Sequence, residues 1–324
     1  DYDTNSFQFI STPNKYYANT SQNRQIETSG NQSETAFTLG GNYQDRLYIN
    51  NNGAFQKSNL PVLKGSNAAV AANDYDGDGD QDLYVVSGGN EFRENDPLLI
   101  DRLYLNDGSG NFSKSNGLLP KTAVSGSCVV AEDFDKDGDL DLFVGGRLIP
   151  GKYLFPARSR VLENNKGTFK DITSKVAPSL EKAGMVSSAL WSDFDQDGLT
   201  DLVITGEWMP IRLFRNTGQK FEEVTKAWGL DSTNGWWNII KECDLNKDGY
   251  PDYVVGNLGE NYKYKANKET PFPVYVTDFD SNGTQDIVLG YSNQGTYYPV
   301  RGRECTSQQM PKIKTQFYRL RAIV

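Results

Sequence analysis

Five stretches of the chain repeat one acidic pattern, and this repetition limits the possible folds more than any other feature of the sequence. The second copy, DFDKDGDLDLFVGG, begins at Asp133, and the others begin at Asp74, Asp193, Asp244 and Asp278. Counted from that first Asp, each copy has a carboxylate or amide side chain at positions one, three, five and nine. Each also has Gly at position six and a large apolar residue at position ten. Five such copies indicate a protein built from structural repeats.

The oxygen-bearing side chains of each copy have the spacing of a calcium-binding loop. Calcium takes about six to eight oxygen ligands in a flexible geometry, and a short loop supplies them from alternate side chains and one backbone carbonyl. Gly at position six permits the tight turn, because glycine tolerates backbone angles closed to other residues. We therefore predict about five Ca²⁺ ions, held by positions one, three, five, seven (through its carbonyl) and nine. These ligands are Asp74, Asp76, Asp78, Asp80 and Asp82; Asp133, Asp135, Asp137, Asp139 and Asp141; Asp193, Asp195, Asp197, Leu199 and Asp201; Asp244, Asn246, Asp248, Tyr250 and Asp252; and Asp278, Asp280, Asn282, Thr284 and Asp286.

The second half of each copy excludes an EF-hand. An EF-hand loop needs a bidentate Glu at position twelve, followed by a helix. Here position twelve is always aliphatic and unable to bind a metal: Val85, Val144, Ile204, Val255 and Leu289. The short β-branched run after position nine is typical of a buried strand. Each loop therefore leads into a strand, and position nine must supply the closing ligand.

Two alternatives to calcium remain. Asp- and Gly-rich clusters also form plain solvated turns, although the same ligand set in five copies argues for a metal. Magnesium fits less well, because it prefers few protein ligands and a strict octahedral geometry. The net charge of −9 would become about +1 with five calcium ions bound. The acidity is thus local to the loops, and the sequence has no basic stripe that would indicate nucleic-acid binding.

A second repeated element lies between the acidic loops. RLYLNDGSGNF, which begins at Arg102, has counterparts that begin at Arg46, Arg160 and Ile211. Each is a strand, an Asn/Gly turn and a strand, which is the signature of a β-hairpin. One repeat therefore contains four antiparallel strands, with the acidic loop between the first two. Such repeats at this spacing predict an all-β fold, a β-propeller of four-stranded blades.

The ends of the array are less regular. Residues 26–34 align with a loop but hold Ile26, Thr28 and Gly30 at ligand positions, so we expect a blade without metal. The step of 34 residues from Asp244 to Asp278 predicts a blade with a reduced outer part. Six blades are countable, and residues 1–25 with the C-terminal tail could form a seventh. We expect a single propeller over residues 1–324, with a degenerate segment at 1–40, clear repeats at 41–300 and a closing or truncated tail at 301–324.

The loops and hairpins resemble the FG-GAP or VCBS-type repeats of integrin α-subunit propellers and of large bacterial surface proteins. DFDKDGDLDLFVGG and RLYLNDGSGNF, with TGEWMP and GWWNIIKECDLNKDG, are most similar to bacterial versions found near ASPIC/UnbV domains in Bacteroidetes. The resemblance covers roughly residues 40–300 and implies a calcium-bearing propeller exported to the cell surface. Two features depart from the pattern. The Gly-Ala-Pro motif is replaced by GGRLIPG at 145–151, and no ASPIC/UnbV segment is recognisable.

The chain contains no histidine, which argues against catalysis. Ser-His-Asp and Cys-His systems, histidine general bases and histidine-bound zinc are all excluded. Carboxylate pairs remain, but calcium already accounts for them. Glu207 and Glu260 follow strands, and we interpret both as exposed structural residues. We therefore expect a protein that is not an enzyme.

Three cysteines lack metal-type spacing and allow at most one disulfide: Cys128, Cys243 and Cys305. Cys128 and Cys243 lie in apolar strand patterns, which favours buried thiols. The chain begins with Asp rather than Met, so we expect a processed or trimmed product. It has no apolar run of about 20 residues that could span a membrane. Millimolar external calcium could fill weak sites, which favours an extracellular or cell-surface location, such as the bacterial outer membrane.

The aromatic residues allow two interpretations. They could stack on sugars or form a protein-binding hot spot, or they could fill the wedges between blades. The candidates are Trp208, Trp228, Trp236, Trp237, Tyr262 and Tyr264. We expect first a surface module that binds a protein partner, for example within an outer-membrane assembly. The alternative is a glycan-binding lectin or an accessory domain of a polysaccharide-processing system.

Overall fold

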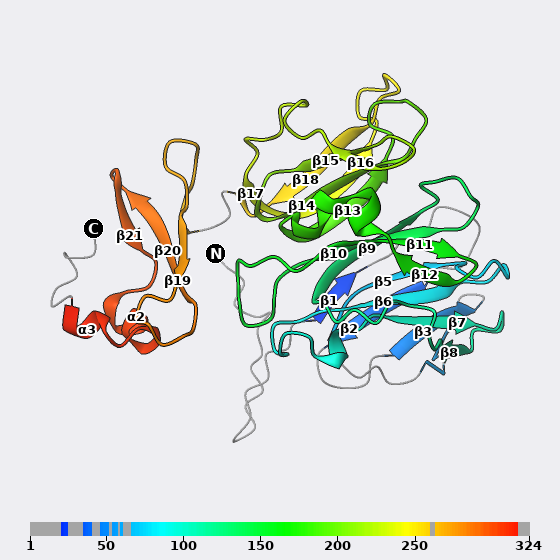
Figure 1. Ribbon diagram of the computed structural model, residues 1–324, viewed down its shortest axis with the longest axis horizontal. Coiled ribbons are helices and arrows are strands. Elements are labelled where there is room, and N and C mark those ends of the chain that lie inside the picture. The colour runs from blue at the N-terminus through cyan, green and yellow to red at the C-terminus, as the bar shows by residue number, and fades with distance from the viewer. Residues whose placement is uncertain are drawn as a thin grey trace. The chain divides into compact units, whose positions relative to one another are not determined.

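The computed structural model describes residues 21–24, 35–40, 46–51, 54–57, 59–60, 66–259 and 263–316 (Figure 1). The chain divides into two compact units, residues 1–64 with 106–113, and residues 65–105 with 114–324. The first unit contains the antiparallel sheet β1-β2-β3-β4, with β1 (Ser21–Arg24), β2 (Thr35–Gly40), β3 (Arg46–Asn51) and β4 (Ala54–Lys57). The predicted loss of metal at Ile26, Thr28 and Gly30 lies outside the described residues, as does Glu260.

The next two repeats each form a four-stranded antiparallel sheet, as the sequence predicts. One sheet has the order β5-β6-β7-β8, with β5 (Asn67–Asn73), β6 (Asp82–Ser87), β7 (Arg102–Asn106) and β8 (Phe112–Lys114). The other has the order β9-β10-β11-β12, with β9 (Gly126–Glu132), β10 (Asp141–Gly146), β11 (Arg160–Asn165) and β12 (Thr168–Asp171). In both sheets the acidic loop joins the first two strands, and the predicted hairpin supplies the outer two. We call each such sheet a blade.

The third and fourth loops lie in one larger sheet. It contains β13 (Met185–Ser192), β14 (Asp201–Met209), β15 (Arg212–Asn216), β16 (Phe221–Glu223), β17 (Gly235–Cys243) and β18 (Asp252–Asn257). The strands β13 to β16 form a blade, and β14 continues past it to pair with β17 at Glu207 and Met209. Of the repeat around the fourth loop, the described residues form only the hairpin β17–β18. This agrees with the reduced outer part predicted there.

The last described strands form a three-stranded antiparallel sheet. It contains β19 (Val274–Thr277), β20 (Asp286–Asn293) and β21 (Thr296–Pro299). The tail then forms two short helices, α2 (Arg303–Gln309) and α3 (Ile313–Gln316), so its described part adds no strand to the array. Other short helical turns are η2 (Pro97–Leu99), α1 (Thr173–Val176) and η3 (Pro178–Lys182). A closed ring of blades is not shown by these elements.

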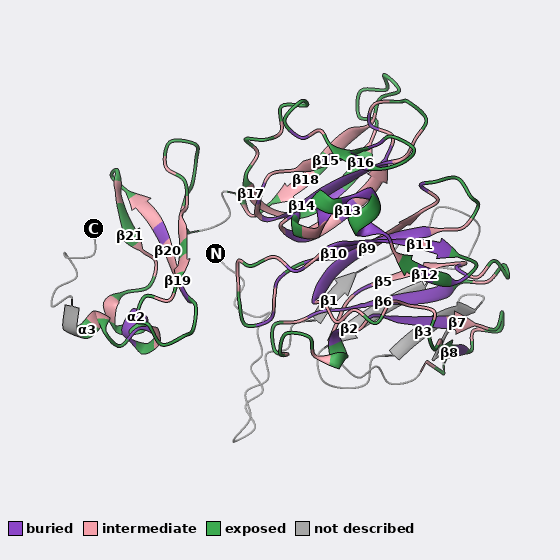
Figure 2. Cartoon of the chain, viewed as in Figure 1, coloured by how far each residue is buried: buried purple, intermediate pink, exposed green. Residues whose placement is uncertain are grey.

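One rule governs how neighbouring blades pack. In the first three loop repeats, position eleven faces the following blade, and in the second to fourth repeats positions ten and twelve face the preceding one, since neighbouring strand residues point to opposite faces. Tyr84 thus lies in one core cluster with Leu142 and Val144 of the next blade. Phe143 likewise lies in one cluster with Leu202 and Ile204 of the following blade. Val203 packs in the same way with Tyr253 and Val255. These contacts join the four repeats through one series of apolar clusters, and Figure 2 shows β6, β10 and β14 as mostly buried, whereas β17 and β18 are mostly intermediate or exposed.

Position eleven of the fourth loop repeat does not follow this rule. Val254 occupies position eleven of the fourth loop repeat, yet it is 52% exposed, whereas Tyr84, Phe143 and Val203 are almost fully buried. Ile239, on the paired strand β17, is also exposed. The far face of the β17–β18 hairpin therefore exposes two large apolar side chains, with Lys241 opposite Val254.

Buried polar contacts also join neighbouring blades. Asn164 Nδ2 donates to the carbonyl of Tyr75 at 2.9 Å, and Asn216 Nδ2 donates to the carbonyl of Phe134 at 3.0 Å. Asn216 is the last residue and Asn164 the last but one of the third strand of its blade, and both carbonyls lie in the acidic loop of the preceding blade. A buried carbonyl requires a donor, so each Asn fixes the position of its neighbour's loop.

An ion-pair network anchors the β9–β12 blade to the turn that follows it. Arg158 contacts Asp171 and Glu181, and the Thr173 hydroxyl also donates to Asp171 at 2.6 Å. Burial by itself raises the pKa of Asp171, but the hydrogen bonds from Arg158 and Thr173 outweigh it and hold the pKa below its usual range. A lowered folded-state pKa stabilises the protein above the unfolded pKa of about 3.9 and loses this contribution as the pH falls further.

We therefore expect Asp171→Asn to destabilise the protein at neutral pH by about 1–3 kcal/mol, because it removes a charge-assisted hydrogen bond. The difference from wild type should begin to shrink as the pH falls below about 4, where Asp171 takes up a proton in the unfolded chain while its lowered pKa keeps it ionised in the folded protein. Urea unfolding at pH 7 and at pH 3.5 measures both values. Asp231→Asn, at an exposed position, is the control. A difference independent of pH would contradict the assignment.

Candidate metal centres in the acidic loops

The backbone of the acidic loops follows the turn geometry that the sequence predicts. Gly at position six has a positive φ in every loop, for example 97° at Gly138 and 86° at Gly249. Position four also has a positive φ, and this holds for residues with side chains, with 63° at Lys136 and 58° at Gln196. Two left-handed residues so close together curl the chain and turn its side-chain oxygens inward.

Hydrogen bonds inside each loop hold the carboxylates in place. In the second loop, the backbone N–H groups of Asp137 and Gly138 both donate to the carboxylate of Asp133, at 3.1 Å each. The N–H of position seven donates to the side chain at position five, as from Asp139 to Asp137 at 2.9 Å. The same contact recurs at Asp80, Leu199, Tyr250 and Thr284. The loops are therefore ordered by their own backbone.

Four of the five loops bring three carboxylates together. In each triplet, one oxygen per residue lies within 4.8 Å of the others, a spacing that could hold a metal ion. The triplets are Asp74, Asp76 and Asp78; Asp133, Asp135 and Asp141; Asp193, Asp195 and Asp197; and Asp278, Asp280 and Asp286. The other predicted side-chain ligands fall outside these described triplets: Asp82, Asp137, Asp201, Asp244, Asn246, Asp248, Asp252 and Asn282. The fourth loop, with Asn at position three, thus contributes no triplet.

The closing carboxylate of the second loop is the residue that most requires a cation. Asp141 is fully buried, and its Oδ1 accepts the N–H of Asn164 at 2.7 Å. Its Oδ2 is buried with no hydrogen-bond partner among the described residues. In the third loop the corresponding oxygen, Oδ2 of Asp201, accepts the N–H of Phe194 at 3.2 Å. A buried carboxylate oxygen without a donor is costly, and a bound cation would satisfy it.

The pKa values of the closing residues follow from the same surroundings. Burial, together with the charges of Asp135, Asp137 and Asp133, raises the pKa of Asp141 to about 8, although the N–H of Asn164 opposes the shift. Burial likewise raises the pKa of Asp201 to about 7. Without a cation, these loops therefore hold carboxylates at a cost in free energy. The donor set, oxygen atoms only, fits a hard divalent cation.

An arginine that the sequence interpretation missed lies at the third loop. Arg215 Nε is 2.6 Å from Asp195, and its Nη2 is 2.8 Å from Asp197. Side-chain hydrogen bonding to Asp197 is the main reason that the pKa of Arg215 is raised. This guanidinium partly neutralises the triplet and would compete with an ion for it. No sequence signal identified it, because the corresponding residue in the preceding blade is Glu163.

Adjacent loops also contact one another through a repeated interaction. The side chain at position four of one loop donates to the carbonyl at position six of the next. Lys136 Nζ donates to Gly198 at 2.6 Å, and Gln196 Nε2 donates to Gly249 at 2.6 Å. We call these two contacts the loop clasps. They place the second, third and fourth loops side by side at one end of the blades.

The opposite end of the blades carries a buried glutamate, so the interpretation of Glu207 as an exposed structural residue is wrong. Glu207 is only 5% exposed. Its Oε1 accepts Nε of Arg147 at 3.1 Å, and its Oε2 accepts the hydroxyl of Tyr153 at 2.9 Å. Burial, and to a smaller extent Glu207, raises the pKa of Tyr153 to about 12. The burial of Glu207 could not be predicted from its local sequence, because Arg147 and Tyr153 come from a connection in another blade.

The described cysteines agree only partly with expectation. Cys128 is buried in β9, whereas Cys243 is half-buried at the end of β17 and Cys305 is exposed in α2. Among the described residues, no helix has the length and apolar character needed to cross a membrane.

A sequence model of the FG-GAP-like repeat family matches residues 74–144 and 193–255. These stretches contain the first, second, third and fourth acidic loops. The resemblance to FG-GAP repeats is thus confirmed there, while the narrower likeness to Bacteroidetes proteins near ASPIC/UnbV domains stays a prediction.

Two solved structures are similar to parts of the chain. One is an Agrocybe aegerita lectin that recognises non-reducing terminal N-acetylglucosamine, with 17% identity, a TM-score of 0.42, and coverage of 78% of this chain and 72% of the lectin. The other is the V. cholerae biofilm matrix protein Bap1, with 14% identity, a TM-score of 0.38, and coverage of 79% of this chain and 33% of Bap1.

Proposed function

We propose that the acidic loops bind calcium and that the protein is a calcium-stabilised, non-enzymatic binding module. The observation that carries the calcium assignment is the buried Oδ2 of Asp141, which has no hydrogen-bond partner among the described residues, in a residue that forms a triplet with Asp133 and Asp135. Bound calcium would neutralise the charge repulsion of these carboxylates and keep them ionised. The loop would then fix the first two strands of its blade, since metal binding is coupled to folding.

We also propose that the blades close into a propeller. Neighbouring first strands support this, because β5 lies beside β9, β9 beside β13, and β13 beside β17. The exposed Val254 is the side chain that would cover the next blade. On β20, Ile287 and Leu289 hold positions ten and twelve, which face the preceding blade elsewhere.

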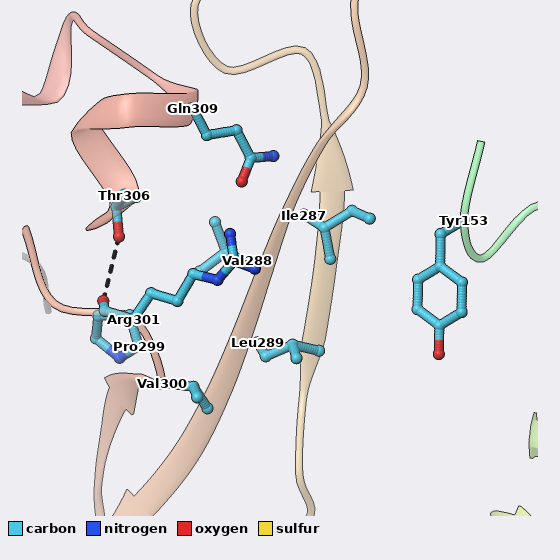
Figure 3. A pocket seen from close by; sticks show the side chains of 9 residues that line it. All are labelled: Tyr153, Ile287, Val288, Leu289, Pro299, Val300, Arg301, Thr306 and Gln309. Atoms are coloured by element: carbon cyan, nitrogen blue, oxygen red, sulfur yellow. Dashed lines mark hydrogen bonds between the residues drawn. The ribbon is translucent and has the colours of Figure 1, made fainter. Parts of the chain in front are cut away.

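Ile287 and Leu289 instead line a cavity, and they lie together on one strand in Figure 3. The other residues that line this cavity are Tyr153, Val288, Pro299, Val300, Arg301, Thr306 and Gln309. Packing of Val254 against Ile287 and Leu289 would extend the interblade core by one blade and bury both apolar faces.

The binding function has two candidate partners, both at the cell surface or outside the cell. A protein partner, for example within an outer-membrane assembly, is favoured by Leu98 and Phe155, which are large apolar side chains exposed on connections between blade strands. A glycan is favoured by the aromatic rings around Trp208. Catalysis is not proposed, because the chain lacks histidine and its clustered carboxylates are assigned to calcium.

Calorimetric titration of chelator-stripped protein with Ca²⁺ tests the calcium assignment. We expect about five bound ions, and we expect Asp141→Asn to remove about one of them, since an amide cannot replace the closing carboxylate. Asp171→Asn, which changes a carboxylate outside the loops, should leave the stoichiometry unchanged. Mg²⁺ in place of Ca²⁺ should bind more weakly. No heat of binding with either ion would overturn the proposal.

A further inference from the structure

The backbone at Trp208 is strained, and this strained conformation sets the direction of the Trp208 side chain. Trp208 has φ of 61°, a left-handed conformation that is an outlier for a bulky residue. It lies in an irregularity of the β14–β17 pairing, between Glu207 and Met209. Both neighbours are buried, while Trp208 itself is half-buried. The bulge thus turns the indole out of the sheet, and such strain persists only where the surroundings hold it.

Those surroundings are a polar network that fixes the edge of the indole. Trp208 Nε1 donates to the hydroxyl of Tyr153 at 3.0 Å, and that hydroxyl donates to Glu207, which also binds Arg147. The tryptophan donor is therefore satisfied inside the protein, and the ring is held by groups from two blades. The edge of the indole is thus fixed, and its ring stacks on that of Phe272 at an interplanar angle of 23°. A ring held in this way is preorganised for contact with a ligand.

Trp208 belongs to a continuous series of aromatic rings. Its centroid lies 5.4 Å from that of Trp236 and 6.1 Å from that of Phe272. From Phe272 the series continues through Tyr264, Tyr291 and Tyr298, with consecutive centroids 6.1, 4.5 and 6.0 Å apart. All six side chains are half-buried or exposed. We call these six residues the aromatic platform.

The chemistry of the platform fits a sugar better than an apolar protein surface. A pyranose ring has an apolar C–H face, which stacks on aromatic rings, and an edge of hydroxyl groups. The platform likewise combines ring faces with polar edges, which are the hydroxyl groups of its tyrosines and the half-exposed guanidinium of Arg147. Lys263 Nζ lies 5.2 Å from the ring centroid of Tyr264 and adds a positive charge. The acidic loops lie at the other end of the blades, so they do not repel an acidic sugar here.

We propose that the aromatic platform binds a polysaccharide chain through stacking of successive pyranose rings. This inference rests on the proposed binding function and names its ligand class. Trp208 and Trp236 form the central contact, and the network of Arg147, Tyr153 and Glu207 positions Trp208.

Native gel electrophoresis in gels that contain a soluble polysaccharide tests the inference. The probes are hydroxyethyl cellulose and xylan, which are neutral or nearly so, and polygalacturonate, which is acidic. We expect retardation of the calcium-loaded wild type by at least one probe. Trp208→Ala and Trp236→Ala should each weaken it at least tenfold, as measured from the dependence on polysaccharide concentration. Trp228→Ala is the matched control, because Trp228 is 49% exposed but packs on Phe194 outside the platform.

A second variant separates binding from folding. Trp208→Gly removes the indole and also relieves the left-handed backbone, so it should melt at or above the temperature of Trp208→Ala while binding no polysaccharide. Retardation that survives in Trp208→Gly would overturn the inference. So would a wild type that binds calcium but is retarded by none of the three probes, or one whose platform captures only a protein partner. These results leave the calcium assignment intact, which the titration tests separately.

Discussion

Chelation of calcium should lower the melting temperature of this protein sharply. A site that binds only the folded state adds about 2.7 kcal/mol when the free ion is at 100 times its Kd. Four triplets lie in the described loops, and three belong to blades that share a continuous core. Their contributions therefore act on one cooperative structure, and we expect a loss of roughly 10 °C or more. Differential scanning calorimetry with and without a chelator measures the change.

The specificity of this effect has its own controls. Restored Ca²⁺ should recover the original melting temperature, whereas the same ionic strength supplied by NaCl should not, because simple screening is not site binding. Asp141→Asn should melt lower than wild type in calcium and respond less to the chelator. If the melting temperature is the same with and without chelator, the loops are solvated turns and the calcium assignment is wrong.

Loss of one buried charge between two blades should have the second large effect. Asp101 and Arg160 form an ion pair at 2.7 Å with both side chains almost fully buried, and the hydroxyl of Tyr84 also donates to Asp101 at 2.8 Å. Asp101→Ala would leave the Arg160 guanidinium buried without its counter-charge. We expect a loss of about 3–5 kcal/mol in the free energy of unfolding, measured with urea at neutral pH.

The double variant distinguishes charge burial from simple packing. Replacement of both partners, as in Asp101→Ala with Arg160→Met, removes the uncompensated charge and should recover part of the lost stability. Lys152, which pairs with Glu94 at the surface, offers a control in Lys152→Ala, with an expected change of less than about 1 kcal/mol. A double variant less stable than Asp101→Ala alone would contradict this account.

The repeats show how far a single sequence constrains this fold. The loop pattern predicts where strands such as β6 and β10 begin, and the Asn/Gly hairpins predict the outer strands of each blade. The pattern also predicts Gly at position six as the residue with a positive φ. These features are local, because each depends on a few consecutive residues. The exposure of Val254 is not a local feature, because the side chain at position eleven is buried only when another blade covers it.

Features that depend on two distant segments could not be predicted. Arg215 reaches the third loop from the hairpin of the same blade, and nothing in its local sequence separates it from Glu163 in the preceding blade. Glu207 resembles an exposed residue until Arg147 and Tyr153 surround it from another repeat. The repeated Asn at the end of the third strand was visible in the sequence, but its donation to the loop of the preceding blade was not.

The loop clasps have a consequence for how the ions would load. Lys136 donates a hydrogen bond to the turn of the third loop, and Gln196 donates one to the turn of the fourth. An ion that orders one of these turns therefore also orders the group to which the neighbouring loop is hydrogen-bonded. Occupancy would then spread along the array as nearest-neighbour statistics describe for repeat proteins, with filled and empty loops tending to occur in runs. An empty loop in the middle of the array would affect calcium binding by both neighbouring loops, whereas an empty loop at its end would affect binding by only one.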